Sequence, residues 1–280
     1  MSLLVDALNR CWSPYFPDEP PVTPVAFKRS IRDLQVWCSS CMVAFSGSDP
    51  IGVLIGAKRP SCTLVHKIAV HPDHRRQGHG RHLLASLGSK LAILGPPRII
   101  AEVPETLAPA CELFNASGYV QESLLTDYVL QREENDAREV AGMSDHDGRF
   151  VIPVTVDDLA ANGLLEEADS QVCWERSVET LTARKDDITG LAVATDERIE
   201  AYVLYATRGT EETEIVSLRS FLDDGGGRLK RLLSQLHARG METFRLPKVH
   251  PAEISKERLE TLGFSPAGRH LLCATRARSA

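Results

Sequence analysis

The chain has 280 residues, of which 43% are hydrophobic and 25% are charged. This balance is typical of a globular protein, and the length exceeds the usual span of one core, so we expect two domains. The net charge of −6 argues against nucleic acid or an anionic membrane as a partner. The first residues, MSLLVDALNRCWSPY, lack the continuous apolar stretch of a signal peptide, which predicts a cytoplasmic protein.

Strands and helices alternate in the first half of the sequence. Apolar runs predict four strands, at 41–46, 51–57, 63–70 and 98–103, and the turn SGSDP joins the first two as a hairpin. Helical spacing predicts two helices, one marked by Leu83, Leu84, Leu87 and Leu91, the other by Ala110, Leu113 and Phe114. A further strand follows. This order predicts an α/β fold with a mixed, mostly antiparallel sheet flanked by helices.

The second half repeats the pattern of the first. FKRSI at 27–31 is echoed by WERSV at 174–178, and VAFSGSDPIGVLIGA resembles AVATDERIEAYVLYA about 148 positions later. Paired glycines and the segment LFNASGY also recur in the same order, which indicates two copies of one fold. We therefore expect a first domain at 1–133, a polar linker at 134–149 and a second domain at 150–280.

The stretch HPDHRRQGHGRHLLASL places three arginines, four histidines and two glycines before an apolar helix. The first amide groups of a helix lack partners inside it and carry partial positive charge. Gly78 and Gly80 let the backbone adopt positive φ and approach a ligand. Arg75, Arg76 and Arg81 add full charges. The pattern predicts a phosphate or diphosphate site, but the P-loop and dinucleotide motifs GxxxxGK[ST] and GxGxxG are both absent.

The residues RRQGHG resemble the [RQ]-x-x-G-x-[GA] signature of the GNAT superfamily of acetyl-CoA-dependent N-acetyltransferases. The segments IAVHP before them and ELFNASGY after them are also similar to the family's pattern. The resemblance covers roughly 5–131 and extends more weakly over 151–275 through the repeat.

This resemblance implies that the first domain binds acetyl-CoA. Backbone groups of the strand before the loop would pair with the pantetheine arm, and amides of the loop would hold the diphosphate. The cofactor-binding residues expected on this basis are Ile68, Ala69, Val70, Arg75, Arg76, Gln77, Gly78, His79, Gly80, Arg81 and Phe114.

Acetyl transfer to an amine requires a neutral amine, a polarised carbonyl and a proton for the departing thiolate. Members of the family commonly take that proton from a Tyr, but this chain has Phe114 at the corresponding position. Either water or another group supplies the proton, or this copy binds CoA and transfers poorly. The candidate bases are His66 and Glu102, on two successive strands, although His66 also fits an ordinary strand position.

Histidines and cysteines raise the alternative of a metal or redox protein. His71, His74, His79 and His82 flank a loop that must face phosphate, so we expect no metal there. An odd number of cysteines, seven, predicts reduced thiols, and the pair in WCSSCMVAF has no second CxxC to complete a zinc site. We expect these cysteines to be buried apolar residues.

The second copy lacks the charge of the first. Asp223 and Asp224 precede its glycines, and carboxylates there would oppose a diphosphate, so we expect no CoA binding in the second domain. The expected function is N-acetyl transfer from acetyl-CoA to a primary amine of a small molecule, with a homodimer left open. The alternative is a non-catalytic acyl-CoA-binding or regulatory protein. Trp12, Tyr15 and Phe16 either line the acceptor site or pack the first helix on the sheet.

Overall fold

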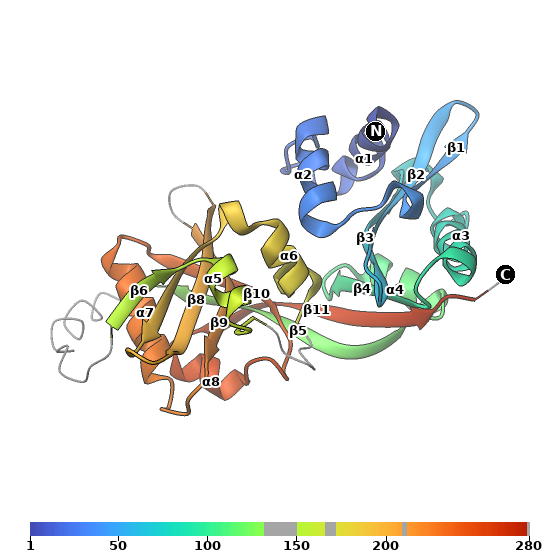
Figure 1. The fold of residues 1–280 in the computed structure, drawn as a ribbon. Coiled ribbons are helices and arrows are strands. Elements are labelled where there is room, and N and C mark those ends of the chain that lie inside the picture. The colour runs from blue at the N-terminus through green and yellow to red at the C-terminus, as the bar shows by residue number, and fades with distance from the viewer. Residues whose placement is uncertain (132–149, 166–171, 209–211, 279–280) are drawn as a thin grey trace. The chain divides into compact units, whose positions relative to one another are not determined.

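The computed structural model describes residues 1–131, 150–165, 172–208 and 212–278, so the predicted linker at 134–149 lies outside the described residues. The chain folds into two compact units (Figure 1). The first combines Met1–Leu124 with His270–Ala280, and the second is Leu125–Arg269. Each is a mixed sheet flanked by helices, which confirms the predicted α/β class.

The first repeat contains the predicted elements in the predicted order. Its elements are α1 (Ser2–Cys11), η1 (Ser13–Tyr15), α2 (Pro24–Leu34), η2 (Cys38–Ser40), β1 (Met42–Ser46), β2 (Asp49–Lys58), β3 (Cys62–Val70), η3 (Pro72–His74), α3 (His79–Leu94), β4 (Arg98–Pro104), α4 (Ala108–Ala116) and β5 (Val120–Gln131). All four predicted strands and both predicted helices of this repeat are present.

The second repeat begins with one additional strand, β6, and then follows the order of the first. Its elements are β6 (Phe150–Val154), α5 (Val156–Ala161), η6 (Trp174–Arg176), α6 (Val178–Ala183), η7 (Lys185–Asp187), β7 (Thr189–Ala194), β8 (Ile199–Arg208), β9 (Glu212–Ser220), α7 (Gly227–Ala238), β10 (Thr243–Val249), α8 (Lys256–Thr261) and β11 (Ser265–Arg276).

The sheet of the first unit runs β1-β2-β3-β4 and ends on part of β11. β1, β2 and β3 are antiparallel, β3 and β4 are parallel, and β4 pairs antiparallel with β11 from His270 to Arg276. In the second unit, β6 to β9 are antiparallel, β10 is parallel to β9, and residues 126–131 of β5 pair with β10. Residues 126–131 of β5, the last strand of the first repeat, thus pair in the second unit, and residues 270–276 of β11, the last strand of the second repeat, pair in the first. The two units therefore differ from the predicted domains at 1–133 and 150–280.

The two repeats share their strand register in detail. β3 pairs with β4 over three residues, from Cys62↔Arg98 to Leu64↔Ile100, and β9 pairs with β10 over three residues as well. A β-bulge interrupts the β2–β3 ladder at Ile55/Gly56, and another interrupts the β8–β9 ladder at Leu204/Tyr205. Equivalent bulges at equivalent positions confirm that the chain is a tandem repeat of one fold.

Helices cover both faces of each sheet (Figure 1). In the first unit, leucines of α3 are buried in one core with Phe114 and Tyr119 and with apolar residues of β2, β3 and β4. α1 packs on β2, its buried side formed by Val5, Leu8 and Cys11. In the second unit, α7 and α8 belong to one core cluster and α5 and α6 to another.

Tyr119 is an exception to the apolar composition of the first unit's core. Its side chain is 5% exposed, and its ring meets that of Phe114 edge to face, with centroids 5.0 Å apart. Its buried hydroxyl has no hydrogen-bond partner among the described residues, and burial raises the pKa of this hydroxyl. An unpaired buried hydroxyl costs free energy in the native state.

We therefore expect Tyr119→Phe to raise the free energy of unfolding by about 1 kcal/mol, because the variant keeps the ring contact and loses the unpaired group. Tyr202→Phe is a matched control, since the Tyr202 hydroxyl accepts a hydrogen bond from Ser217 Oγ at 3.3 Å. That variant should lose stability instead. Urea titration measures both, and a loss of stability in Tyr119→Phe would show that its hydroxyl is paired.

Candidate functional site

The site begins where two parallel strands of the first unit separate. β3 pairs with β4 only from Cys62 to Leu64, although β3 continues to Val70. Along its other edge β3 stays paired with β2, with Gly52 opposite Val70. The His71 N–H donates to Ile51 O at 2.8 Å, which makes Gly52 and Val70 a non-hydrogen-bonded pair of the antiparallel ladder.

This register fixes where the backbone groups of β3 point. In a non-hydrogen-bonded pair, the N–H and C=O of each residue face away from the partner strand. Ile68 lies opposite Leu54 at the same phase of the ladder as Val70. The backbone groups of Ile68 and Val70 therefore face the gap on the β4 side, as expected for the strand that would pair with pantetheine. Ala69 has the opposite phase, so its backbone groups face β2.

A cavity of about 620 Å³ occupies this region of the first unit. It is lined by residues of η1, β3, the loop after β3, the start of α3, β4 and α4. Of the predicted site residues, those that line it are His66, Ile68, Ala69, Val70, Arg75, Arg76, Gly78, His79, Gly80, Arg81, Glu102 and Phe114. Gln77 is the predicted residue that does not line this cavity.

The loop before α3 contains two residues of positive φ, Arg76 and Gly78, and both line the cavity. Gly78 is the N-cap of α3 with φ 87°, and a Cβ built there would meet nothing within 4 Å. Arg76 adopts φ 61°, which is uncommon for a residue with a side chain. The first hydrogen bond of the helix runs from His82 N to Gly78 O at 3.0 Å. The amides of His79 to Arg81 precede this ladder and are available to an anion.

Gly80 has a different role from the one predicted. It lies inside α3 and does not have positive φ, so that prediction was wrong. A Cβ at Gly80 would approach Leu113 Cδ1 and Cδ2 to 3.1 Å. The glycine therefore allows α4 to pack closely against the first turn of α3.

The arginines of the loop have separate partners. Arg76 Nη1 lies 3.5 Å from Glu112 Oε2, and both side chains are mostly exposed. The Arg75 guanidinium lies over the ring of Tyr15, 5.5 Å from its centroid. Exposed pairs of this kind contribute little stability, so either cation can turn toward an anionic ligand at low cost.

The candidate bases lie on the two strands that separate. His66 is the extra residue of the β3 bulge, since Val65 and Lys67 pair with the consecutive residues Gly56 and Ile55. Bulges change the direction of a side chain and occur often beside active sites. Glu102 is partly buried on β4, and both side chains line the cavity.

Phe114 also lines the cavity, but only 4% of it is exposed, and its ring packs against Tyr119. The position where the family commonly has a proton donor is thus part of the apolar core. Among the described residues, no group of three or more His, Cys, Asp or Glu is arranged to hold a metal ion. No helix that the structure describes is both long and apolar enough to cross a membrane.

Aromatic residues from the segment after α1 line the same cavity. The Tyr15 hydroxyl donates to Val70 O at 2.6 Å, and the rings of Trp12 and Phe16 stack with centroids 4.6 Å apart. Lys67 Nζ lies 4.2 Å from the centroid of Trp12. No pattern in the sequence indicates the Tyr15–Val70 bond, which joins residues 55 positions apart.

Comparisons with known proteins agree with this geometry. Residues 2–119 match the model of the acetyltransferase (GNAT) family. Residues 2–119 therefore form a GNAT domain. A search of curated protein sequences finds no match to the chain.

Solved structures of the GNAT fold resemble nearly the whole chain. A tandem GNAT protein from the clavulanic acid biosynthesis pathway is 17% identical, with a TM-score of 0.65, and the match covers 99% of this chain and 94% of that one. A GCN5-related N-acetyltransferase from Sphaerobacter thermophilus is 15% identical, with a TM-score of 0.67 and coverage of 98% and 91%. Eis1 from Mycobacterium abscessus is 16% identical, with a TM-score of 0.56 and coverage of 99% and 71%. The tandem GNAT arrangement thus accounts for both units.

In the second GNAT-like unit the corresponding helix begins in the same way, but a carboxylate of the chain lies at its N-terminus. Gly226 is the N-cap of α7 with φ 90°, as Gly78 is for α3. Asp224 Oδ1 accepts a hydrogen bond from the Gly226 N–H at 3.0 Å, and its Oδ2 accepts one from the Arg228 N–H at 2.8 Å. A carboxylate of the chain itself therefore occupies the anion position of this helix.

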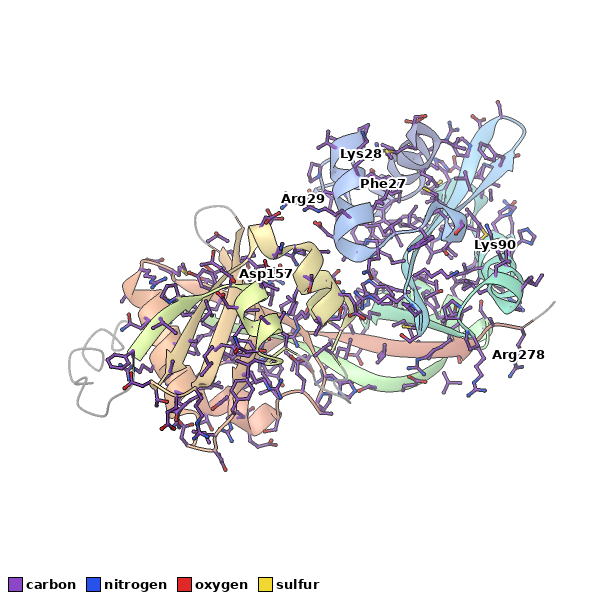
Figure 2. All side chains as sticks on the ribbon, in the orientation of Figure 1. Phe27, Lys28, Arg29, Lys90, Asp157 and Arg278 are labelled. Atoms are coloured by element: carbon purple, nitrogen blue, oxygen red, sulfur yellow. The ribbon has the colours of Figure 1, made fainter. Side chains whose placement is uncertain are left out.

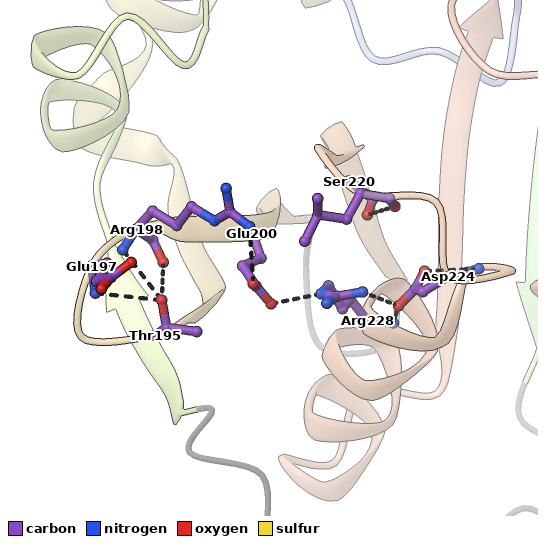
Figure 3. A network of polar contacts seen from close by, with 9 residues as sticks. Thr195, Glu197, Arg198, Glu200, Ser220, Asp224 and Arg228 are labelled. Carbon is purple, nitrogen blue, oxygen red and sulfur yellow. Dashed lines mark hydrogen bonds and ion pairs between the residues drawn. The ribbon is translucent and has the colours of Figure 1, made fainter.

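A network of ion pairs holds that carboxylate in place (Figure 3). Arg228 Nη1 donates to Asp224 Oδ2 at 2.7 Å, and Arg228 Nε donates to Glu200 Oε2 at 2.8 Å. Burial alone would raise the pKa of Asp224, but the hydrogen bonds from Arg228 and Gly226 together with the charge of Arg228 lower it below its ordinary value. Burial alone would lower the pKa of Arg228, but its hydrogen bonds to Glu200 and Asp224 and their negative charges raise it.

We expect Asp224→Asn to lower the free energy of unfolding by about 2 kcal/mol at pH 7, because it weakens the cap and leaves Arg228 with less compensating charge. The contribution of a carboxylate with a lowered pKa is complete above its ordinary pKa of about 4 and is lost as the pH falls through the native value. Denaturant titrations from pH 7 to pH 3 should therefore show the two proteins converging.

Asp223→Asn provides the control, since the Asp223 side chain is 85% exposed and pairs with Arg258 at the surface. Its effect should stay below about 1 kcal/mol. A stability difference for Asp224→Asn that did not shrink at low pH would contradict the assigned ionic role.

Proposed function

We propose that this protein is an N-acetyltransferase that moves an acetyl group from acetyl-CoA to a primary amine of a small molecule, with the cofactor held by the first unit. The observation that carries the proposal is the cavity of about 620 Å³ that joins the separated ends of β3 and β4 to the start of α3. Its volume lies in the usual range of small-molecule sites. The GNAT domain at residues 2–119 supports acyl transfer as the reaction class.

The residues of the cavity fit the two chemically distinct parts of acetyl-CoA. Backbone groups of Ile68 and Val70 face the gap and can pair with the amides of a pantetheine arm. The amides at the start of α3, with Arg75 and Arg76 beside them, suit a diphosphate. Acetyl-CoA supplies an acyl group activated as a thioester. The Tyr15 hydroxyl already donates a hydrogen bond to Val70 O. When the arm binds, either this carbonyl accepts from both Tyr15 and the arm, or the arm displaces the hydroxyl.

The chain's own residues supply the remaining chemistry. A backbone N–H facing the gap, such as that of Ile68, can polarise an acyl carbonyl. His66 or Glu102 can accept the proton of the incoming amine, directly or through one water. Phe114 cannot return a proton to the thiolate, so we assign that proton to water or to the protonated base.

Binding of CoA tests the first step. Gly78→Glu and Arg76→Glu should each reduce CoA affinity at least about 100-fold in titration calorimetry, since both place a carboxylate beside the diphosphate position. Gly47→Glu is the matched control, because Gly47 also has positive φ and open space at its Cβ but lies in the β1–β2 turn and does not line the cavity. Unchanged CoA affinity in both loop variants would refute the proposed cofactor site.

Steady-state kinetics over a range of pH test the base. If His66 accepts the proton, His66→Gln should lower kcat by about 100-fold and remove the acidic limb of its pH profile, with KM for acetyl-CoA nearly unchanged. Glu102→Gln has the same expected signature if Glu102 is the base. The two variants therefore serve as controls for each other, and retention of the full profile by both would exclude both residues.

The buried Phe114 favours a second candidate function, a non-catalytic acyl-CoA-binding or regulatory protein of the same fold. Thiol release above background with a panel of amines excludes this alternative. Tight CoA binding without thiol release from any amine of the panel supports it.

We further propose that the second unit does not bind CoA. The Asp224 carboxylate already accepts the hydrogen bonds that a diphosphate would need, and a second anion beside it would be repelled. The stoichiometry in the CoA titration should accordingly be one per chain.

A further inference from the structure

A second cavity of about 600 Å³ lies in the first unit and meets the first cavity at the start of α3. Gly78, Arg81 and Ala116 line both cavities. The second continues along α3 and is bounded by residues after α4, by the last two residues of β11 and by Arg278 beyond that strand. A ligand whose diphosphate rests on the α3 amides can therefore extend into either cavity.

The charge of the second cavity is one-sided. Arg81, Arg276 and Arg278 line it, whereas no Asp or Glu does. Five other arginines of this unit have carboxylate partners, namely Arg10, Arg29, Arg32, Arg76 and Arg98. The three arginines of the second cavity have no carboxylate partner among the described residues. Three guanidinium groups without a counter-ion around one cavity are suited to a multiply charged anion.

Two backbone features bring the end of the chain to this cavity. β11 pairs with β4 up to Arg276↔Arg98, and the Ala277 N–H then donates to Pro97 O at 2.6 Å. Gly88 of α3 faces this segment, because a Cβ built there would lie 4.0 Å from Arg278 O. Figure 2 shows Arg278 just beyond the end of β11. Arg276 and Arg278 are thus held in the first unit although the sequence places them in the second repeat.

We propose that this second cavity binds the 3′-phosphorylated adenosine end of CoA, with Arg276 and Arg278 contacting the 3′-phosphate. The inference rests on the proposed function, since it assumes the diphosphate at the start of α3. The pantetheine arm leaves the diphosphate toward the gap between β3 and β4, so the nucleoside leaves on the other side, where the second cavity begins. A phosphate monoester carries up to two negative charges, which guanidinium groups bind through paired hydrogen bonds. The second repeat therefore completes the cofactor site of the first.

Comparison of CoA with 3′-dephospho-CoA tests the assignment, because the two ligands differ only in the 3′-phosphate. In titration calorimetry of the full-length protein we expect CoA to bind about tenfold more tightly than dephospho-CoA. The ratio is modest because exposed ion pairs contribute little free energy, and it should decrease with added salt because salt screens them. Arg276→Ser with Arg278→Ser should bring the ratio to about one by weakening CoA alone. Arg278→Ser by itself, beyond the last strand, should produce part of the effect without disturbing the sheet.

Lys90→Gln is the control for the single variant, since it also removes one positive charge but lies on α3 and lines neither cavity (Figure 2). This variant should leave the ratio unchanged. Equal affinity of both ligands for the unsubstituted protein, or a ratio that survives the double substitution, would overturn this inference and leave the proposed function standing. Failure of both ligands to bind the unsubstituted protein would overturn the proposed function and this inference with it.

Discussion

The site depends on the separation of β3 from β4 after three paired residues. Each strand is paired along its outer edge, β3 by seven residue pairs with β2 and β4 by seven with β11. Backbone N–H and C=O groups that lose a neighbouring strand must find other partners. The Tyr15 hydroxyl is such a partner, because it donates a hydrogen bond to Val70 O. The other backbone groups of β3 that face the gap are the ones that the proposed function assigns to the pantetheine arm.

The two repeats show that this frame does not by itself determine chemistry. Both have the three-residue parallel pairing, the bulge and a positive-φ glycine that caps the following helix. They differ just before the helix. In the second repeat, Asp224 accepts hydrogen bonds from the backbone N–H groups of Gly226 and Arg228, whereas the first repeat has Arg75 and Arg76 in the loop before the helix. A carboxylate tethered two residues away competes with a free anion at a very high effective concentration. One residue therefore gives the start of α7 a carboxylate cap that the start of α3 lacks.

Most of the fold was predictable because local patterns determine it. Apolar alternation placed β1 to β4, and the glycines and arginines pointed to a loop that lines the cavity. The φ of Gly80 was assigned wrongly, because glycine can serve either close packing or positive φ, and the contact with Leu113 that decides between them comes from another helix. The positive φ of Arg76 had no sequence signal at all.

The exchange of last strands was also beyond sequence reasoning, and it has the widest consequence. β5 and β11 occupy equivalent places in the two repeats, so their patterns do not specify which sheet each one joins. In the structure, residues 270–276 cover the edge of β4 in the first unit, and residues 126–131 pair with β10 in the second. In each sheet, a strand of the other repeat thus covers backbone N–H and C=O groups that would otherwise be exposed, and exposed sheet edges promote aggregation. By supplying β11 to the first sheet, the second repeat has a structural role there, whether or not it binds a ligand.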